Sequence, residues 1–202
     1  MPFFSVEDAV PQVKKADRRD AIVAAAFALF SSSGYTSTTM SAIARAAQMT
    51  VANLYVYFDS KLLILYEIYR PWLYRQLETL KTDVAALGTP REKLERLLVG
   101  LWRDIPAADH SFANALIEAL ANVPAESGKP DSLLAEVEQF LTTVLIDAVP
   151  ARRRSAVEDG TLAHIVWMAF DGFVINQRIG DLRDIDRIAS LTTTLLLGEA
   201  LH

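Results

Sequence analysis

Hydroxyl, amide and ammonium side chains gather in one short stretch of the chain, from Thr39 to Lys61. Thr39 and Thr50 each stand before a run of residues with helical spacing, and a threonine oxygen at that position accepts hydrogen bonds from the free N–H groups of a helix start. Leu54 and Phe58 are four residues apart and mark the inward face of the second helix. Two short helices joined by a tight turn, the second with small residues at its start and tyrosines near its end, favour insertion into the major groove of DNA.

Residues on both sides of this turn carry a resemblance to a known family. They are the apolar run Ile22–Phe30, the pair Gly34-Tyr35, Thr39 with Ile43-Ala44, the run Leu54–Phe58 and the pair Ser60-Lys61. In order and spacing, residues 18–61 resemble the N-terminal domain of the TetR family of bacterial transcriptional regulators. The resemblance implies a helix-turn-helix domain of three helices joined by a linking helix to a C-terminal helical domain for ligand binding and dimerisation. It also implies a repressor that binds a palindromic operator as a homodimer and is released by a small molecule.

Three residues depart from the family pattern. Gln48 stands where the family usually has glycine, so a residue with a Cβ must adopt the left-handed conformation expected at the turn. Ala42 occupies a position that is often acidic, so the first helix lacks a reciprocal capping box. Ala52 replaces a frequent glycine. We expect the motif to be kept, with strain at Gln48.

The resemblance assigns DNA contacts residue by residue. It implies phosphate contacts at Thr39, Ser41, Thr50, Tyr55, Tyr57 and Lys61, and base contacts at Val51, Ala52 and Asn53. A threonine at a helix N-terminus suits a phosphate, and asparagine can pair with adenine in the major groove. The alternatives are that the two tyrosines only pack against the next helix and that Asn53 is a solvated helix residue.

Charge is distributed unevenly along the chain. The 202 residues carry a net charge of −5, but residues 14–61 carry +3 and residues 62–202 carry −6. A basic head on an acidic body is typical of a DNA-binding module joined to a part that does not touch DNA, although so small an excess also arises by chance. The chain has no cysteine, which excludes thiol catalysis and cysteine-bound metal. We find no signal peptide and no apolar run of membrane-spanning length, and we expect a cytoplasmic protein that binds no membrane.

Helical periodicity extends through the chain, and no strand-like alternation interrupts it. We expect an all-α fold with a helix-turn-helix domain at residues 1–61, including a flexible arm to about residue 15, and a helical domain at residues 62–202. A linking helix should begin at Lys61, and Pro71 should kink or interrupt it. Thr89 and Glu92 predict a capping box at the start of a later helix.

The middle helices combine aromatic walls with a few polar groups, as small-molecule sites do. The residues that we expect at an effector site are Trp102, Phe112, Asn114, Ile117, Glu118, Phe140, Trp167, Phe170 and Asp171. The alternative for each is an ordinary place in the core. Apolar side chains surround nearly the whole helix near Trp167, so we expect this helix and the last one to form a dimer interface. The expected interface residues are Trp167, Phe170, Val174, Ile188, Leu191 and Leu195.

The sequence contains no HExxH motif, no nucleophile elbow and no glycine-rich phosphate loop. The three histidines form no metal-binding or nucleophilic motif, so we expect no metal, no cofactor and no enzymatic activity. His164 lies in an apolar helix and is expected to be a core residue. The expected partners are an operator in double-stranded DNA, a second copy of the chain and an unidentified small molecule. The competing hypothesis is an all-α small-molecule-binding protein or enzyme whose N-terminal motif does not bind DNA.

Overall fold

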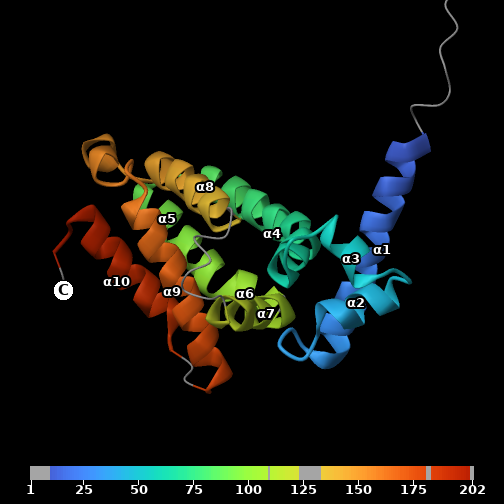
Figure 1. Ribbon diagram of the computed structural model, residues 1–202. Coiled ribbons are helices and arrows are strands. Elements are labelled where there is room, and N and C mark those ends of the chain that lie inside the picture. The colour runs from blue at the N-terminus through green and yellow to red at the C-terminus, as the bar shows by residue number, and fades with distance from the viewer. Residues whose placement is uncertain (1–9, 109, 123–132, 181–182, 201–202) are drawn as a thin grey trace, which may run out of the picture. The chain divides into compact units, whose positions relative to one another are not determined.

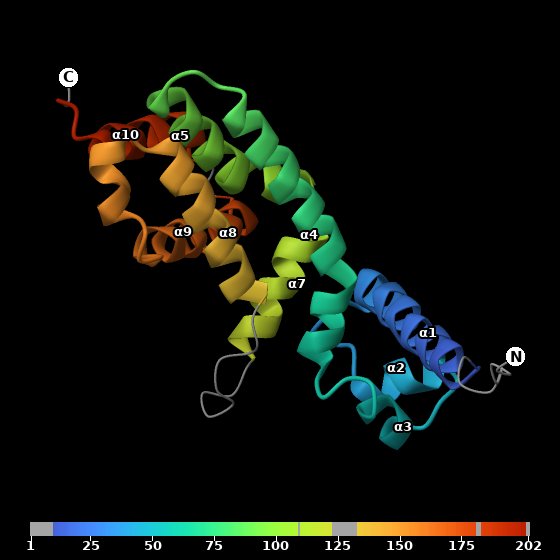
Figure 2. The same ribbon diagram turned by 90° about the horizontal axis from the view of Figure 1, so that it is seen from above.

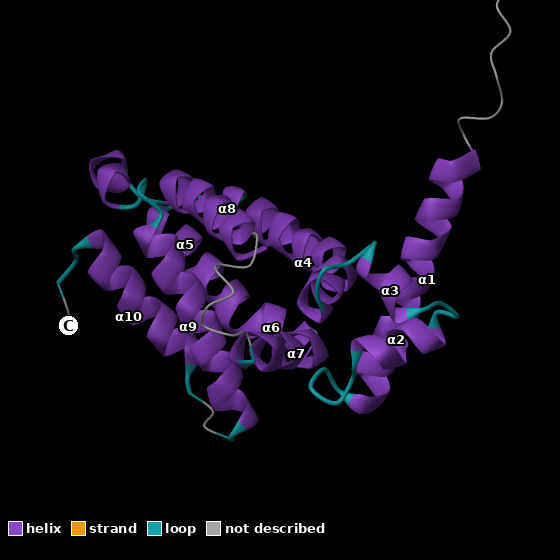
Figure 3. Ribbon diagram, in the orientation of Figure 1, coloured by secondary structure: helices purple, strands orange, loops and turns teal. Residues whose placement is uncertain are grey.

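The computed structural model describes residues 10–108, 110–122, 133–180 and 183–200. Within these ranges every regular element is a helix and there is no strand, which confirms the all-α prediction (Figure 3). None of the helices in the described ranges has the length and apolar character needed to cross a membrane.

The chain divides into two compact units. The first contains residues 1–71 together with residues 118–122, and the second contains residues 72–117 and 123–202. Two helices, α4 (Lys61–Ala85) and α7 (His110–Ala121), contain residues of both units. Chain connectivity between the units therefore includes two continuous helices.

The first unit is built from α1 (Val10–Ser33), α2 (Met40–Ala46), α3 (Val51–Tyr55) and the start of α4 (Figure 1). Each of these helices contributes apolar side chains to one core, among them Ile22, Ile43, Leu54 and Leu65, which are fully buried. Helix α1 already includes Val10 to Lys15, which the sequence assigned to a flexible arm, and the earlier part of that arm lies outside the described residues. Pro11 lies in the first turn of the helix, where its missing N–H would have no partner within the helix.

Helix α4 passes through Pro71 without a break. Of the two predicted effects of Pro71, an interruption is therefore wrong, whereas a kink stays a prediction. Its side chain is exposed, and the boundary between the units falls directly after it. A proline at this place removes one backbone hydrogen bond from the helix where it leaves the first unit.

The second unit packs the rest of the chain into a helical bundle. Its elements are α4 from Trp72 onward, α5 (Pro90–Val99), a π-helical turn (Gly100–Asp104), α6 (Ile105–Ala108), the first part of α7, α8 (Leu133–Ala148), a 3-10 turn (Ala151–Ala156), α9 (Thr161–Arg178) and α10 (Ile185–Leu197). Helix α5 packs against α10, and α8 packs against both α5 and α9 (Figure 2). These contacts bury the apolar faces of α5 and α8 in one core.

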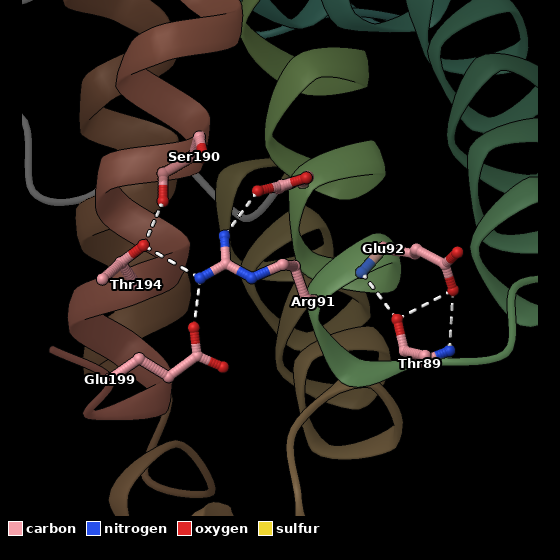
Figure 4. A network of polar contacts seen from close by, with 7 residues as sticks. Thr89, Arg91, Glu92, Ser190, Thr194 and Glu199 are labelled. Carbon is pink, nitrogen blue, oxygen red and sulfur yellow. Dashed lines mark hydrogen bonds and ion pairs between the residues drawn. The ribbon is translucent and has the colours of Figure 1, made fainter. Parts of the chain in front are cut away.

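Polar contacts fix the start of α5 against α10 (Figure 4). The capping box is present as predicted, because Thr89 Oγ1 accepts from Glu92 N–H at 3.2 Å and Glu92 Oε2 accepts from Thr89 N–H at 2.9 Å. The Arg91 guanidinium donates to Thr194 Oγ1 at 3.0 Å and also pairs with Glu199. One arginine thus joins the first turn of α5 to the end of α10.

Candidate nucleic-acid interface and effector site

Threonine side chains define the start of both short helices in the first unit. Thr39 Oγ1 accepts the N–H of Ala42 at 3.1 Å, and Thr50 Oγ1 accepts the N–H of Asn53 at 3.1 Å. Both threonines have the extended backbone of an N-cap residue. The two caps predicted from the sequence are therefore confirmed, and each hydroxyl retains its own hydrogen for donation to a phosphate.

The turn between α2 and α3 has the backbone that the sequence predicts. Gln48 has φ 55°, which makes it the one non-glycine residue with positive φ in the described ranges. The N–H of Met49 donates to the carbonyl of Ala44 at 2.9 Å and closes the turn. A side chain in the left-handed region costs about 1–2 kcal/mol, so packing of the two helices must hold Gln48 there.

Most of the expected DNA contacts lie on accessible surface. Thr39, Ser41, Thr50, Ala52 and Tyr55 are exposed, and Val51, Asn53 and Tyr57 are partly exposed. Leu54 and Phe58 are buried, as the predicted inward face requires. The first turn of α3 is thus accessible to a DNA duplex, and so is Tyr55 at the end of this helix.

Lys61 differs from the other expected contacts because its ammonium is already engaged. The Nζ atom donates to the carbonyls of Tyr35 at 2.7 Å and Thr38 at 2.6 Å, and it lies 4.2 Å from the centre of the Tyr35 ring. Burial lowers the pKa of Lys61, and the negative charge of Glu118 acts in the opposite direction. A phosphate contact at Lys61 stays a prediction, and the structure adds a second role for this residue, which is to hold the loop between α1 and α2.

Glu118 lies in the first unit, although the sequence suggested an effector site. Its Oε2 atom accepts from Thr36 Oγ1 at 3.1 Å and from Thr36 N–H at 3.4 Å. These residues are 82 positions apart, and no local pattern in the sequence signals the contact. Burial of the neighbouring Tyr35 raises the pKa of its hydroxyl to about 12, so the ring stays neutral within this cluster.

Aromatic residues expected at the effector site lie in the core of the second unit. Trp102 Nε1 donates to the carbonyl of Val166 at 3.0 Å, and its ring packs against Phe173 with centroids 5.1 Å apart. Trp167 and Phe170 stack with centroids 4.6 Å apart, and both are buried. The π-helical turn that carries Trp102 and the helix α9 thus meet through aromatic side chains.

Two polar atoms on α9 are buried without a hydrogen-bond partner in the described part of the chain. They are Nε1 of Trp167 and Oδ1 of Asp171, which lie one helical turn apart. Burial raises the pKa of Asp171 from its ordinary 3.8 to about 6. Polar atoms of this kind are rare in proteins, and a bound ligand is one partner that would satisfy them.

The remaining expected effector residues are placed less centrally. Asn114, Ile117 and Phe140 are half-buried, and Lys81 Nζ lies 5.6 Å from the Phe140 ring centre. Phe112 belongs to α7, but its side chain lies outside the described residues. A hollow of about 290 Å³ adjoins Trp102 and Phe173 and is otherwise lined mainly by polar residues, among them Gln177 and Arg183. His164 is exposed rather than buried in the core, and its Nδ1 pairs with Glu138 Oε1 at 2.6 Å.

An exposed apolar face runs along α9 and α10. It consists of Ile165, Met168 and Ile175 on α9, the C-cap residue Ile179, and Leu191 and Leu195 on α10, whose exposed fractions range from 45 to 72%. Ile165 and Leu195 line one shared hollow, so the two parts of the face adjoin. Trp167, Phe170 and Val174, which we expected at a dimer interface, are buried within the chain, while Ile188 is half-buried.

Comparison with known proteins identifies the family. Residues 22–68 match the family model described as bacterial regulatory proteins, tetR family. The transcriptional regulator RutR of Escherichia coli is 31% identical over 160 residues, which cover 75% of this chain and 69% of that protein. The transcriptional repressor KstR of Mycolicibacterium smegmatis is 27% identical over 194 residues, which cover 90% of this chain and 88% of the relative.

A solved structure supports the same fold over nearly the whole chain. The TetR-family repressor FadR of Thermus thermophilus, crystallised with lauroyl-CoA, aligns with a TM-score of 0.61 and 20% identity, covering 91% of this chain and 95% of that one. The named relatives are transcriptional regulators and repressors, which agrees with the expectation that the chain is no enzyme. The chain therefore belongs to the TetR family of bacterial regulatory proteins and is a transcriptional repressor of that family.

Proposed function

We propose that the protein binds a two-fold symmetric operator as a homodimer and releases it when a small molecule binds the second unit. The observation that supports DNA binding most strongly is the pair of capped helices joined at Gln48, with Thr39, Thr50 and Tyr55 exposed. One such module contacts too few base pairs for strong specificity, so two copies related by a two-fold axis are needed. In this proposal residues 1–61 bind DNA in the cytoplasm and residues 62–202 bind the effector and the second copy.

The exposed apolar face of α9 and α10 supports the dimer. Soluble monomers seldom leave several large aliphatic side chains exposed together, and a second copy of the same face would cover them. Gly172 lies among these residues on α9, and a side chain there would meet no atom of its own chain within 4 Å. Two helices can approach closely at such a position.

The effector is defined by the groups that would meet it. Aromatic rings of Trp102, Trp167 and Phe170 supply apolar walls, and the unpartnered atoms of Trp167 and Asp171 supply a hydrogen-bond donor and a carboxyl group. A mainly apolar molecule with a hydroxyl or amide group would satisfy both atoms. Such a molecule releases DNA only if it binds better to the conformation that does not bind DNA.

Selection of duplexes from a random pool, followed by fluorescence anisotropy, tests DNA binding directly. We expect a near-palindromic duplex, nanomolar-range affinity and a strong salt dependence. Tyr55→Ala should weaken binding. Lys93→Met in α5 should leave binding unchanged and is the control for the loss of a positive charge in Lys61→Met. Failure to select any duplex would reject the proposal.

Lys61→Met separates its two possible roles. Removal of a phosphate contact reduces the slope of log affinity against log salt by about one, whereas a displaced loop lowers affinity without that change in slope. The bonds from Lys61 to Tyr35 and Thr38 lead us to expect the second result.

A further inference from the structure

The loop between α1 and α2 is held from two sides by side chains of opposite charge. The Lys61 ammonium binds the carbonyls of Tyr35 and Thr38, and the Glu118 carboxylate binds the hydroxyl and the N–H of Thr36. Residue 39 of this loop is the N-cap of α2, so the position of the loop sets the start of the helix-turn-helix. A displaced loop would move the first of the two helices that are expected to meet DNA.

Glu118 is placed where one helix passes from one unit to the other. Helix α7 begins in the second unit, and residues 118–122 belong to the first. The side chain of Asn122 donates to the carbonyl of Glu118 at 2.6 Å and closes the end of the helix. The carboxylate that binds Thr36 therefore stands on a helix whose first part, as far as Ile117, belongs to the expected effector unit.

The two charged groups also support each other. Burial disfavours the charged form of Lys61, and Glu118 is the group whose negative charge opposes this effect. Loss of Glu118 would therefore weaken the hold of Lys61 on the loop as well as removing the bonds to Thr36. The bonds from Thr36 to Glu118, at 3.1 and 3.4 Å, are the ones that a small displacement of α7 would break.

We propose that Glu118 is a positioning residue for DNA binding and that its bonds to Thr36 pass a displacement of α7 to the helix-turn-helix. The proposal rests on the proposed release of operator DNA by an effector. In this proposal α7 transmits the effector signal in addition to the linking helix α4. In the absence of effector the carboxylate holds the loop in the DNA-binding position, and withdrawal of α7 frees the loop.

Hydrogen exchange on the free, full-length protein tests the contact itself. Glu118→Ala removes the carboxylate, Thr36→Val removes the hydroxyl and keeps the longer backbone bond at 3.4 Å, and Glu78→Ala removes an exposed glutamate from α4 as a matched control. We expect amides of residues 34–39 to exchange roughly tenfold faster in the first two variants and at the wild-type rate in the control. Thr36→Val keeps the size of the side chain and leaves α7 intact, so it decides the question if Glu118→Ala folds poorly.

Operator binding and its effect on α7 test the transmission. With a duplex selected by the wild-type protein, we expect both variants to bind roughly tenfold more weakly and the double variant to be no weaker than either. Bound duplex should slow exchange in residues 110–122 of the wild type but not of Glu118→Ala. Wild-type exchange rates for residues 34–39 in both variants, or a strictly additive double variant, would overturn the proposal. Absence of any selected duplex would reject the proposed function instead, while exchange in the free protein still decides the loop contact.

Discussion

Gln48 carries backbone strain that the fold tolerates. Its φ of 55° lies where glycine is free and other residues are not. Gln48→Gly should raise the free energy of unfolding by about 0.5–1 kcal/mol, because relief of strain exceeds the added flexibility of the unfolded chain. Urea denaturation measures the change. The same substitution at Gln139, inside α8, should lower stability by about 1 kcal/mol, and a loss at both positions would contradict the argument.

Asp171 should make stability depend on pH. Burial raises its pKa in the folded state to about 6 from an ordinary 3.8, so the folded chain holds the proton to higher pH than the unfolded chain does. Stability from this group is therefore full below about pH 4 and declines as pH rises to about 6, by at most about 1.4 kcal/mol per pH unit.

Asp171→Asn should remove this decline. The difference in free energy of unfolding between variant and wild type, measured by urea denaturation from pH 4.5 to 7.5, should move in favour of the variant up to about pH 6 and then level off. Asp17→Asn, which removes one negative charge from exposed α1, is the control. A constant difference for Asp171→Asn would show that the carboxyl is not buried as described.

At the scale of elements, two capping threonines allow the contribution of a helix cap to stability to be distinguished from a direct contact with DNA. Thr50 caps α3 in the first unit and Thr89 caps α5 in the second, each through a hydrogen bond to a backbone N–H. Thr50→Ala and Thr89→Ala should each cost about 1 kcal/mol of stability in thermal or urea denaturation. Only Thr50→Ala should also weaken operator binding, and equal binding by the two variants would remove Thr50 from the interface.

The sequence predicts those features of the elements that depend on neighbours within about four residues. The caps at Thr39 and Thr50 and the buried pair Leu54 and Phe58 follow from local spacing and are confirmed, as is the left-handed turn at Gln48, which the family resemblance implies. The continuous helix through Pro71 does not follow, because packing can override the cost of one lost hydrogen bond. Contacts between distant residues leave no periodic signal in the sequence, as the bonds of Glu118 to Thr36 show.

Helix α9 shows a second limit of local spacing. Apolar side chains surround it, so periodicity alone cannot separate the face that packs inward from the face that stays exposed. The structure separates them: Trp167 and Phe170 are buried, whereas Ile165 and Met168 are more than half exposed. The candidate dimer face therefore lies beside the residues that the sequence first suggested.

At the scale of the whole molecule, this distinction makes the proposed dimer testable. Met168→Glu and Leu195→Glu place charges on the exposed face and should leave the folded chain intact while shifting sedimentation from dimer to monomer. Operator affinity should fall when dimerisation is lost, because a monomer contacts one half-site only. Thr143→Glu, at an exposed position on α8, controls for an added charge. Trp167→Ala should instead lower stability by about 3–5 kcal/mol through a core cavity. Dimers that survive both glutamate substitutions would show that the two copies meet at another surface.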